Sequence, residues 1–334
     1  MYRFGTHPRD DAVTERVGST AYLFLNSADR NQNAVPGGNT VTQPIDVAWN
    51  DFKIQRPQQL LGSFARRIRP TDVKFPWYIP NIMKGKNDVI YFTVGGTDYT
   101  ITLVSEFYLP SELVTALNNA LQTAVGGSGL APIFTYDTKN QRYTVTSPAS
   151  TGDTFLMYPT SPSSPSPSFD TWTNTPSLFK TLGFTYSQAD SPPTIVSGEF
   201  MTGVQTLSSY TDYVEILSNK MMTYTDVWDG QSGQGGSNAI MRIQATDETS
   251  MNQLTDVNGE PLPNTCRPFV IYRQFKMPKA IKWNPDSTID WLDIKVVDMY
   301  GSLIPLPAFN QSSTITGGVS YYPDFQITLL ASED

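Results

Sequence analysis

Short apolar segments with a two-residue period, separated by glycine, proline and asparagine, run through most of this chain of 334 residues. In the segment 291–297, for example, every second residue is a large aliphatic one: Leu292, Ile294 and Val296. Alternation of this kind places all the apolar side chains on one side of a strand, where they can be buried against a second sheet. The pattern therefore predicts a mainly β protein built as an antiparallel β-sandwich.

The expected strands fall into two groups. Three precede residue 80 and five follow residue 205: 22–25, 41–49, 68–79, 213–217, 239–243, 269–272, 291–297 and 325–330. Eight strands in two sheets are what a single jelly roll requires. Prolines 70, 76 and 80 interrupt the third segment, and proline cannot donate to a ladder, so this segment is expected to be an edge strand or a bulged one.

The segment between the two groups has a different character. Two alternating runs flank Gly95-Gly96, which predicts a tight hairpin over 89–103. Apolar residues at helical spacing from Leu113 to Ala124 predict a helix with Ser111 as its N-cap and Gly126-Gly127 at its end. A second hairpin is expected from 133–136 and 142–146.

These observations predict an inserted α+β domain at 86–200, containing hairpin, helix, hairpin and the Pro/Ser loop 159–168. The jelly-roll domain would then be discontinuous, formed by 19–85 and 201–334, with 1–18 as an N-terminal arm. Insertions of this size are tolerated on surface loops, because they leave the core strands in place.

Histidine and cysteine each occur once, as His7 and Cys266. That scarcity excludes a disulfide framework, a Cys/His zinc site and a catalytic set built around a well-placed histidine. His7 lies in a polar terminal stretch. Cys266, beside Pro263 and Arg267, is interpreted as structural and not as a nucleophile.

Other candidate sites have simpler structural interpretations. The Gly-rich loop 230–236 lacks the Gly-Lys-Ser/Thr ending of a phosphate loop, and Asp256–Glu260 fits an Asn-Gly turn better than a calcium loop. The adjacent carboxylates at 10–11 and 247–248 point apart on a strand. The tryptophans in strand-like stretches are interpreted as core residues, with a sugar-binding platform as the alternative: Trp49, Trp77, Trp283 and Trp291.

We therefore assign no catalytic, cofactor-binding or metal-binding residue, and we expect a protein that is not an enzyme and needs no cofactor. An enzyme that uses carboxylates alone, such as a glycosidase, stays open as an alternative, since composition does not exclude a pair of Asp or Glu side chains across a cleft.

The charge is unevenly distributed along the chain. The formal net charge is −8, but residues 1–80 hold ten Lys/Arg and seven Asp/Glu, a balance of +3. The densest basic cluster is Arg66-Arg67-Ile68-Arg69, which is either a solvated strand edge or a face turned toward a polyanion or an acidic neighbour. No apolar run is long enough for a transmembrane helix or a signal peptide, and a single cysteine favours a reducing interior.

Several motifs resemble those of a known family. The first set comprises Tyr22–Arg30 (YLFLNSADR), Val73–Ile82 (VKFPWYIPNI), Asn87–Phe92 (NDVIYF), and Ser177–Phe184 (SLFKTLGF) after the predicted helix. The second set comprises Leu292–Gly301 (LDIKVVDMYG), with its Asp-x-x-Gly turn, and the terminal strand Phe325–Leu330 (FQITLL). In order and spacing they resemble the minor capsid and penton-type jelly-roll proteins of virophages, polinton-like viruses and nucleocytoplasmic large DNA viruses.

The resemblance implies a structural virion protein, the five-fold penton of an icosahedral double-stranded DNA virus capsid, assembled inside the host cell. Its expected partners are copies of itself, as a homopentamer in preference to a trimer, and other capsid proteins including the major capsid protein. The basic N-terminal region is also considered for a weak contact with DNA or an acidic neighbour. A minor capsid protein that cements capsomers and a lectin-like carbohydrate-binding β-sandwich are the alternatives.

Overall fold

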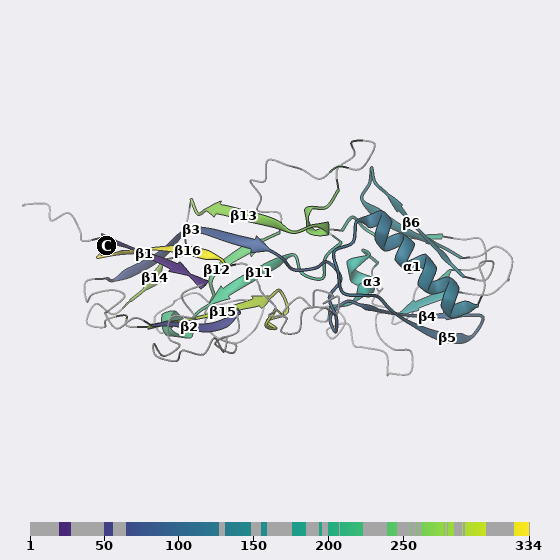
Figure 1. The fold of residues 1–334 in the computed structure, drawn as a ribbon, viewed down its shortest axis with the longest axis horizontal. Coiled ribbons are helices and arrows are strands. Elements are labelled where there is room, and N and C mark those ends of the chain that lie inside the picture. The colour runs from purple at the N-terminus through teal and green to yellow at the C-terminus, as the bar shows by residue number, and fades with distance from the viewer. Residues whose placement is uncertain are drawn as a thin grey trace, which may run out of the picture.

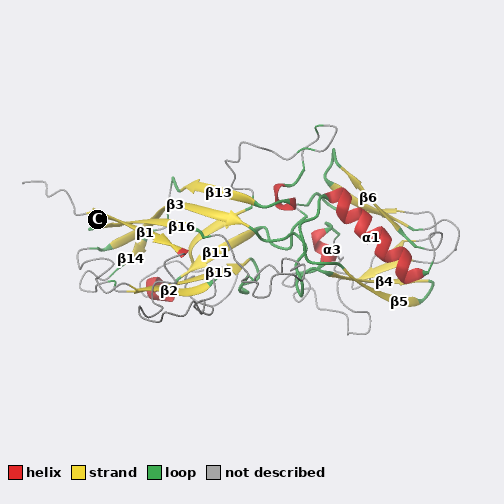
Figure 2. Cartoon of the chain, in the orientation of Figure 1, coloured by secondary structure: helices red, strands yellow, loops and turns green. Residues whose placement is uncertain are grey.

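The fold was analysed in a computed structural model (Figure 1). It describes residues 20–27, 50–55, 65–126, 131–147, 155–158, 176–184, 194–195, 200–206, 208–222, 239–245, 255, 259, 262–276, 278, 280–283, 289, 291–304 and 324–333. Strands predominate, and the longest described helix lies with its own strands at the end of the molecule opposite the marked C-terminus (Figure 2). Predicted segments 41–49 and 159–168 lie outside the described residues.

Eight strands form two sheets at the end of the molecule where the chain terminates. In chain order they are β1 (Thr20–Asn26), β2 (Asp51–Gln55), β3 (Arg67–Trp77), β11 (Tyr213–Leu217), β12 (Ala239–Gln244), β13 (Phe269–Gln274), β15 (Trp291–Asp298) and β16 (Gln326–Ser332). One sheet has the order β1-β16-β3-β13 and the other β12-β11-β15-β2, and all the pairings are antiparallel. The two-residue strand β14 (Ile281–Lys282) adds to the start of β3.

The pairing follows a single rule along the chain. Among these eight strands the first pairs with the last, the second with the seventh, the third with the sixth and the fourth with the fifth. A long antiparallel ribbon wrapped into two sheets gives this order, which is the jelly roll. The mainly β fold class is therefore confirmed. Three strands precede the second core and five follow it, but the second early strand is Asp51–Gln55 and not the predicted 41–49, which lies outside the described residues.

The two sheets bury their facing side chains in a first core. Leu292, Ile294 and Val296 point inward from one sheet, as their spacing predicts, and each is fully buried. Rings join the layers: Phe325, which directly precedes β16, has its centroid 5.9 Å from that of Phe52 on β2 and 5.8 Å from that of Phe75 on β3.

Strand β3 departs from one expectation. It lies inside its sheet, between β16 and β13, so the prediction of an edge strand is wrong and the alternative of a bulged strand is confirmed. The register with β16 shifts between Thr328 and Leu329, opposite Asp72 and Pro70, which leaves Thr71 as the extra residue. Its hydroxyl donates to the carbonyl oxygen of Thr328 at 3.2 Å. The bulge thus absorbs the interruption that Pro70 causes.

The chain leaves this core after β3 and returns to it before β11, and the segment between builds a second core. Its elements are β4 (Val89–Val94), β5 (Thr97–Thr102), α1 (Pro110–Val125), β6 (Ile133–Asp137), β7 (Arg142–Thr146), β8 (Phe155–Tyr158), α3 (Leu178–Thr181), β9 (Thr194–Ile195) and β10 (Phe200–Thr202). They form the sheets β5-β4-β8-β9 and β10-β7-β6. Both predicted hairpins are confirmed, and Gly95 and Gly96 take the positive φ angles of 55° and 78° that a two-residue turn needs.

Helix α1 begins two residues earlier than predicted. Pro110 is its first residue and Leu109 its N-cap, so the assignment of Ser111 as N-cap is wrong. Proline suits this first position because its missing N–H has no partner there in any helix. The side chain of Glu112 accepts the backbone N–H of Leu109 at 2.7 Å, and Gly126 ends the helix at φ 83°, as predicted.

Candidate functional site

Among the residues that suggested chemistry, the structure describes Cys266 and Gly259. Cys266 is fully buried, the amide of Asn81 donates to its Sγ at 3.8 Å, and burial raises the pKa of the thiol to about 12. A thiol that stays protonated and covered is not a nucleophile, which agrees with the structural interpretation. Gly259 has φ 80°, as the turn interpretation of its segment requires. His7, the loop 230–236 and the carboxylates at 10–11 and 247–248 lie outside the described residues.

Within the described ranges, no group of three or more His, Cys, Asp or Glu side chains is arranged to hold a metal ion. No described helix is long and apolar enough to span a membrane. The features that remain as candidates for function are therefore surfaces and the contacts between the two cores.

The tryptophans divide into two classes. Trp77 and Trp283 are buried, as expected of core residues. Trp291 is only half-buried and lies on the outer face of its sheet, between the ammonium groups of Lys53 and Lys220, at 4.8 and 4.9 Å from the ring centroid. The core prediction for Trp291 is therefore wrong, because its alternation with buried Leu292 turns it outward. Trp49 lies outside the described residues.

The outer face of the β1-β16-β3-β13 sheet exposes large apolar side chains at both of its edge strands. On β1, Tyr22 and Phe24 are 61% and 71% exposed, with their rings stacked at 6.3 Å; on β13, Val270 and Tyr272 are 46% and 48% exposed. We call these four residues the apolar outer face. The register places Phe24, Thr328, Asp72 and Gln274 side by side, so both edges belong to one face of the sheet.

The middle of this face is polar, and its groups have partners. Asp72 accepts hydrogen bonds from the hydroxyls of Thr71 and Thr328, at 3.0 and 2.8 Å. Apart from the half-buried Leu330 on β16, the large apolar side chains exposed on this face lie on the two edge strands, which are also the strands with one unpaired side among the described residues. Edge strands with exposed aromatic side chains favour association with other chains.

The outer face of the other sheet is charged and largely paired. Arg242 on β12 and Glu215 on β11 face each other across the ladder, with Nη2 and Oε1 2.7 Å apart. Lys295 on β15 pairs with Asp51 on β2 at 3.5 Å. The two outer faces of the jelly roll therefore differ in chemistry, and among the described residues large exposed apolar groups lie at the edges of the β1-β16-β3-β13 sheet only.

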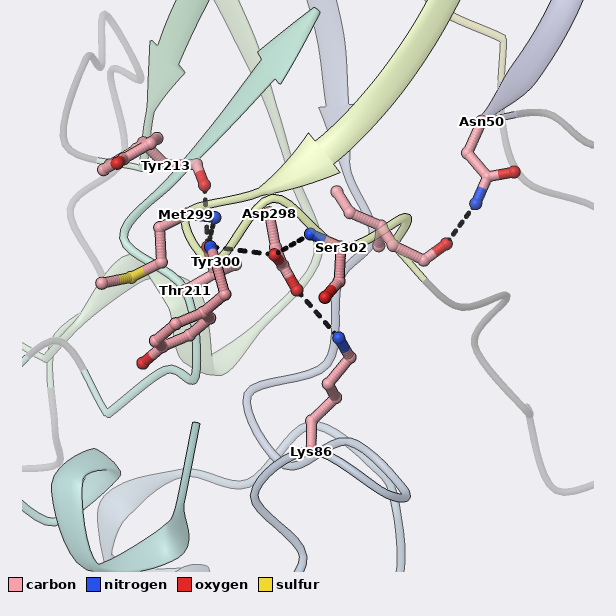
Figure 3. A network of polar contacts seen from close by, with 9 residues as sticks. Asn50, Lys86, Thr211, Tyr213, Asp298, Met299, Tyr300 and Ser302 are labelled. Carbon is pink, nitrogen blue, oxygen red and sulfur yellow. Dashed lines mark hydrogen bonds and ion pairs between the residues drawn. The ribbon is translucent and has the colours of Figure 1, made fainter. Parts of the chain in front are cut away.

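A turn at the end of β15 joins the two cores. Lys86, from the loop before β4, places its Nζ 3.0 Å from Oδ2 of Asp298, whose side chain is fully buried (Figure 3). The other oxygen of Asp298 accepts the backbone N–H groups of Tyr300 and Ser302, both at 2.9 Å. This is the Asp-x-x-Gly turn of the sequence motif, with Gly301 at φ 75°. We call Lys86, Asp298, Tyr300 and Lys180 the junction.

Lys180 of α3 supplies the second contact of the junction. Its Nζ lies 5.3 Å from the ring centroid of Tyr300, and burial lowers its pKa to about 8. Two lysines of the second core therefore hold one turn of the jelly roll, one by an ion pair and one over an aromatic ring.

Two asparagines of the sequence motifs organise the loop that carries Lys86. Asn87 donates to the carbonyl oxygen of Asn81 at 2.7 Å and to the hydroxyl of Thr181 at 2.8 Å, and it accepts the N–H of Met83 at 2.8 Å. Asn81 pairs in both directions with the backbone of Tyr108. The motifs marked these positions, but their role as buried connectors was not predicted.

Comparison with known proteins gave matches among solved structures alone: no family model and no curated protein matches. A penton protein of mavirus aligns at a TM-score of 0.44 with 12% identity, over 93% of this chain and 99% of that one. The 3.5 Å cryo-EM structure of the Sputnik virophage includes a chain that aligns at 0.43 with 12% identity, over 94% and 98%.

Proposed function

We propose that this protein is a structural component of a virion, the penton at the five-fold vertices of an icosahedral DNA virus capsid. The observation that carries the proposal is the complete jelly-roll pairing with exposed aromatic side chains at an unpaired edge. The sequence motifs that resemble penton-type proteins support the same role. No catalytic role is proposed, since the one cysteine is buried and the described residues hold no cluster of three or more His, Cys, Asp or Glu side chains.

The proposed domain division follows the two cores. Residues 19–85 and 201–334 would form the jelly roll, 86–200 the inserted domain and 1–18 an arm. Separate clusters of buried side chains support it, since Val73 and Val214 belong to one cluster and Leu117 and Phe134 to the other. The junction would then fix the inserted domain on the jelly roll.

Assembly would use the apolar outer face in a head-to-tail contact. A cyclic oligomer other than a dimer needs two different patches on each copy, so this face would pack against another surface of the neighbouring subunit. A stable interface buries about 1,600 Å² in total. Five copies are preferred to three, and the same ring would contact the major capsid protein at its rim.

The charge distribution suggests an orientation in the particle. Residues 86–200 hold four Lys/Arg and nine Asp/Glu, a balance of −5, whereas residues 1–80 balance at +3. Arg67 at the start of β3 lies opposite Ser332 in the β3–β16 ladder. It therefore lies near the C-terminus, at the end of the jelly roll remote from α1 (Figure 1). We propose that this basic end faces DNA or an acidic neighbour inside the particle and that the acidic inserted domain faces outward.

Size-exclusion chromatography with multi-angle light scattering tests the proposal on the full chain. A closed pentamer at micromolar to millimolar concentration is the expected result. A protein that stays monomeric at the highest concentration and does not bind the major capsid protein contradicts it. A monomer that binds capsomers of the major capsid protein would instead identify a cementing protein.

A further inference from the structure

A groove runs between α1 and the edge strand β5, in the second core. It has a volume of about 480 Å³ and is lined on the strand side by five consecutive residues, 100–104. On the helix side it is lined by small side chains, including Ala116, Ala120 and Ala124. The larger leucines of the helix, such as Leu117, point into the core. The groove therefore exists because one stripe of α1 is too small to fill the space beside β5.

The strand that forms one wall has an unpaired edge. β5 is the last strand of the β5-β4-β8-β9 sheet, and no described strand lies beyond it. Leu103 donates its N–H to Asp88 across the ladder at 2.7 Å, so alternate residues of β5 turn their backbone groups toward β4. The backbone groups of Thr100 and Thr102 must then point outward, along the groove.

The same helix covers the edge of another strand. The side-chain amide of Asn118 donates to the carbonyl oxygen of Phe134 on β6 at 2.9 Å and accepts its N–H at 2.8 Å, as a neighbouring strand would. The next residue, Asn119, lines the groove and is exposed. In Figure 1, α1 passes between β6 on one side and β5 on the other. The helix thus closes one sheet edge and leaves the other open.

The end of the groove near Tyr108 is acidic. Glu112 lines an adjoining hollow together with Ala116 and Asn119, two residues that also line the groove. Burial raises the pKa of Tyr108, and the negative charges of Glu106 and Glu112 raise it further. Both glutamates are exposed, and Asp98 is exposed at the other end of β5. Arg267 lies 3.5 Å from Glu112, but residues 87–138, which include β5 and α1, contain no Lys or Arg, so the acidic groups are in excess. An occupant that carries positive charge at this end would be favoured, and one with negative charge would be repelled.

We propose that the α1–β5 groove is a docking site for an extended, basic peptide segment of a partner protein, which pairs with the free edge of β5. Addition of a strand beside a helix-lined groove obtains its affinity from main-chain hydrogen bonds and its specificity from alternate side chains. The small residues of α1 would accept those side chains. The site stands whether or not the chain assembles into a capsid.

A second copy of this chain is a poorer occupant. Pairing of two β5 edges about a two-fold axis would bring together two sets of the same acidic side chains, Asp98, Glu106 and Glu112. Like charges across a ladder destabilise the pairing. The acidic rim therefore favours a partner of opposite charge.

Selection from a phage-displayed library of random dodecapeptides on the immobilised full chain tests this proposal. The peptides recovered are then synthesised with a fluorescent label, and their affinity is measured by anisotropy. We expect sequences enriched in Lys and Arg and poor in proline, because proline removes ladder donors.

Variants of the groove then test whether the selected peptides bind there. Ala124→Phe fills the groove from an exposed helix position, and Thr100→Pro removes an outward N–H from the edge of β5. Each is expected to weaken binding at least about tenfold. Gln122→Phe is the matched control, since Gln122 is an exposed residue of the same helix that does not line the groove, and it should change affinity less than about twofold.

The charge dependence is a separate readout. Glu106→Gln should weaken binding of the selected peptides and reduce its sensitivity to salt. Circular dichroism of every variant checks that the fold is intact. A library that yields no enriched peptide, or peptides that bind the Ala124→Phe and Thr100→Pro proteins as tightly as the parent, would overturn the proposal.

Discussion

Lys86 and Asp298, 212 residues apart in the chain, form an ion pair at 3.0 Å between the second core and the jelly roll. The carboxylate of Asp298 is fully buried and also accepts two backbone N–H groups of its own turn. It therefore orders the turn and, at the same time, holds the ammonium group of Lys86. Removal of one partner of a buried ion pair is strongly destabilising, because the other charge stays buried without its counter-charge.

Replacement of Asp298 by Asn should therefore lower the free energy of unfolding by about 1–3 kcal/mol, because the ammonium of Lys86 loses its counter-charge. Urea denaturation followed by tryptophan fluorescence measures the change. Glu215→Gln is the matched control: it removes the more exposed pair with Arg242 and should cost less than about 1 kcal/mol. Equal losses in the two variants would contradict the assigned role of the junction.

The second lysine of the junction predicts a pH dependence. Burial lowers the pKa of Lys180 from 10.5 to about 8 in the folded chain, so the unfolded state binds more protons between these values. The contribution of Lys180 to stability should then rise as the pH increases from 8 to 10.5. Comparison with Lys180→Met at pH 7.5 and 10 isolates this group. A stability difference that is constant or falls over this range would refute the assignment.

The local elements could be predicted from the sequence because their signals are local. Gly95-Gly96 specifies a two-residue turn, and the leucine spacing in 113–121 specifies a helix whatever surrounds it. Strand β2 was not predicted. The alternating residues that end at Trp49 led to a predicted strand over 41–49, whereas the ladder with β15 covers Asp51–Gln55. The choice of partner strand is set by the whole sheet and not by the strand itself.

The candidate surfaces were harder to predict, for a physical reason. In Tyr22–Leu25 every residue is apolar, so alternation does not reveal which pair is buried; the structure buries Leu23 and Leu25 and exposes Tyr22 and Phe24. The junction joins residues that are remote in sequence, and no local pattern links Lys86 to Asp298. The motifs that resemble penton-type proteins include Asn81 and Asn87, but the sequence alone assigned these asparagines no structural role.

Cys266 should be chemically silent in the folded protein. Burial covers its sulfur and raises the thiol pKa to about 12, so almost no thiolate exists at pH 8. Ellman's reagent should release no colour from the native chain and one equivalent from the chain in concentrated urea. Rapid reaction of the native protein would show that Cys266 is accessible and would reopen the question of its chemistry.

Phe325 should carry much of the contact between the two sheets of the jelly roll. Its ring meets Phe52 and Phe75, and its side chain is almost completely buried. Phe325→Ala is expected to lower the free energy of unfolding by about 3–5 kcal/mol through a cavity that the rigid sheets cannot close. Phe200 on β10 is 70% exposed, so Phe200→Ala should change the free energy of unfolding by less than about 0.5 kcal/mol. A small loss at Phe325 would contradict the assigned packing.

The central claim is that the protein assembles through its apolar outer face, and sedimentation velocity of two matched variants tests it most directly. Tyr22→Ser/Phe24→Ser removes the exposed aromatics of β1, whereas Phe200→Ser removes an equally exposed ring outside that face, since Phe24 and Phe200 are 71% and 70% exposed. We predict that the parent and Phe200→Ser sediment as the same closed oligomer and that the double variant sediments as a folded monomer. An oligomer that persists unchanged in the double variant would contradict the account.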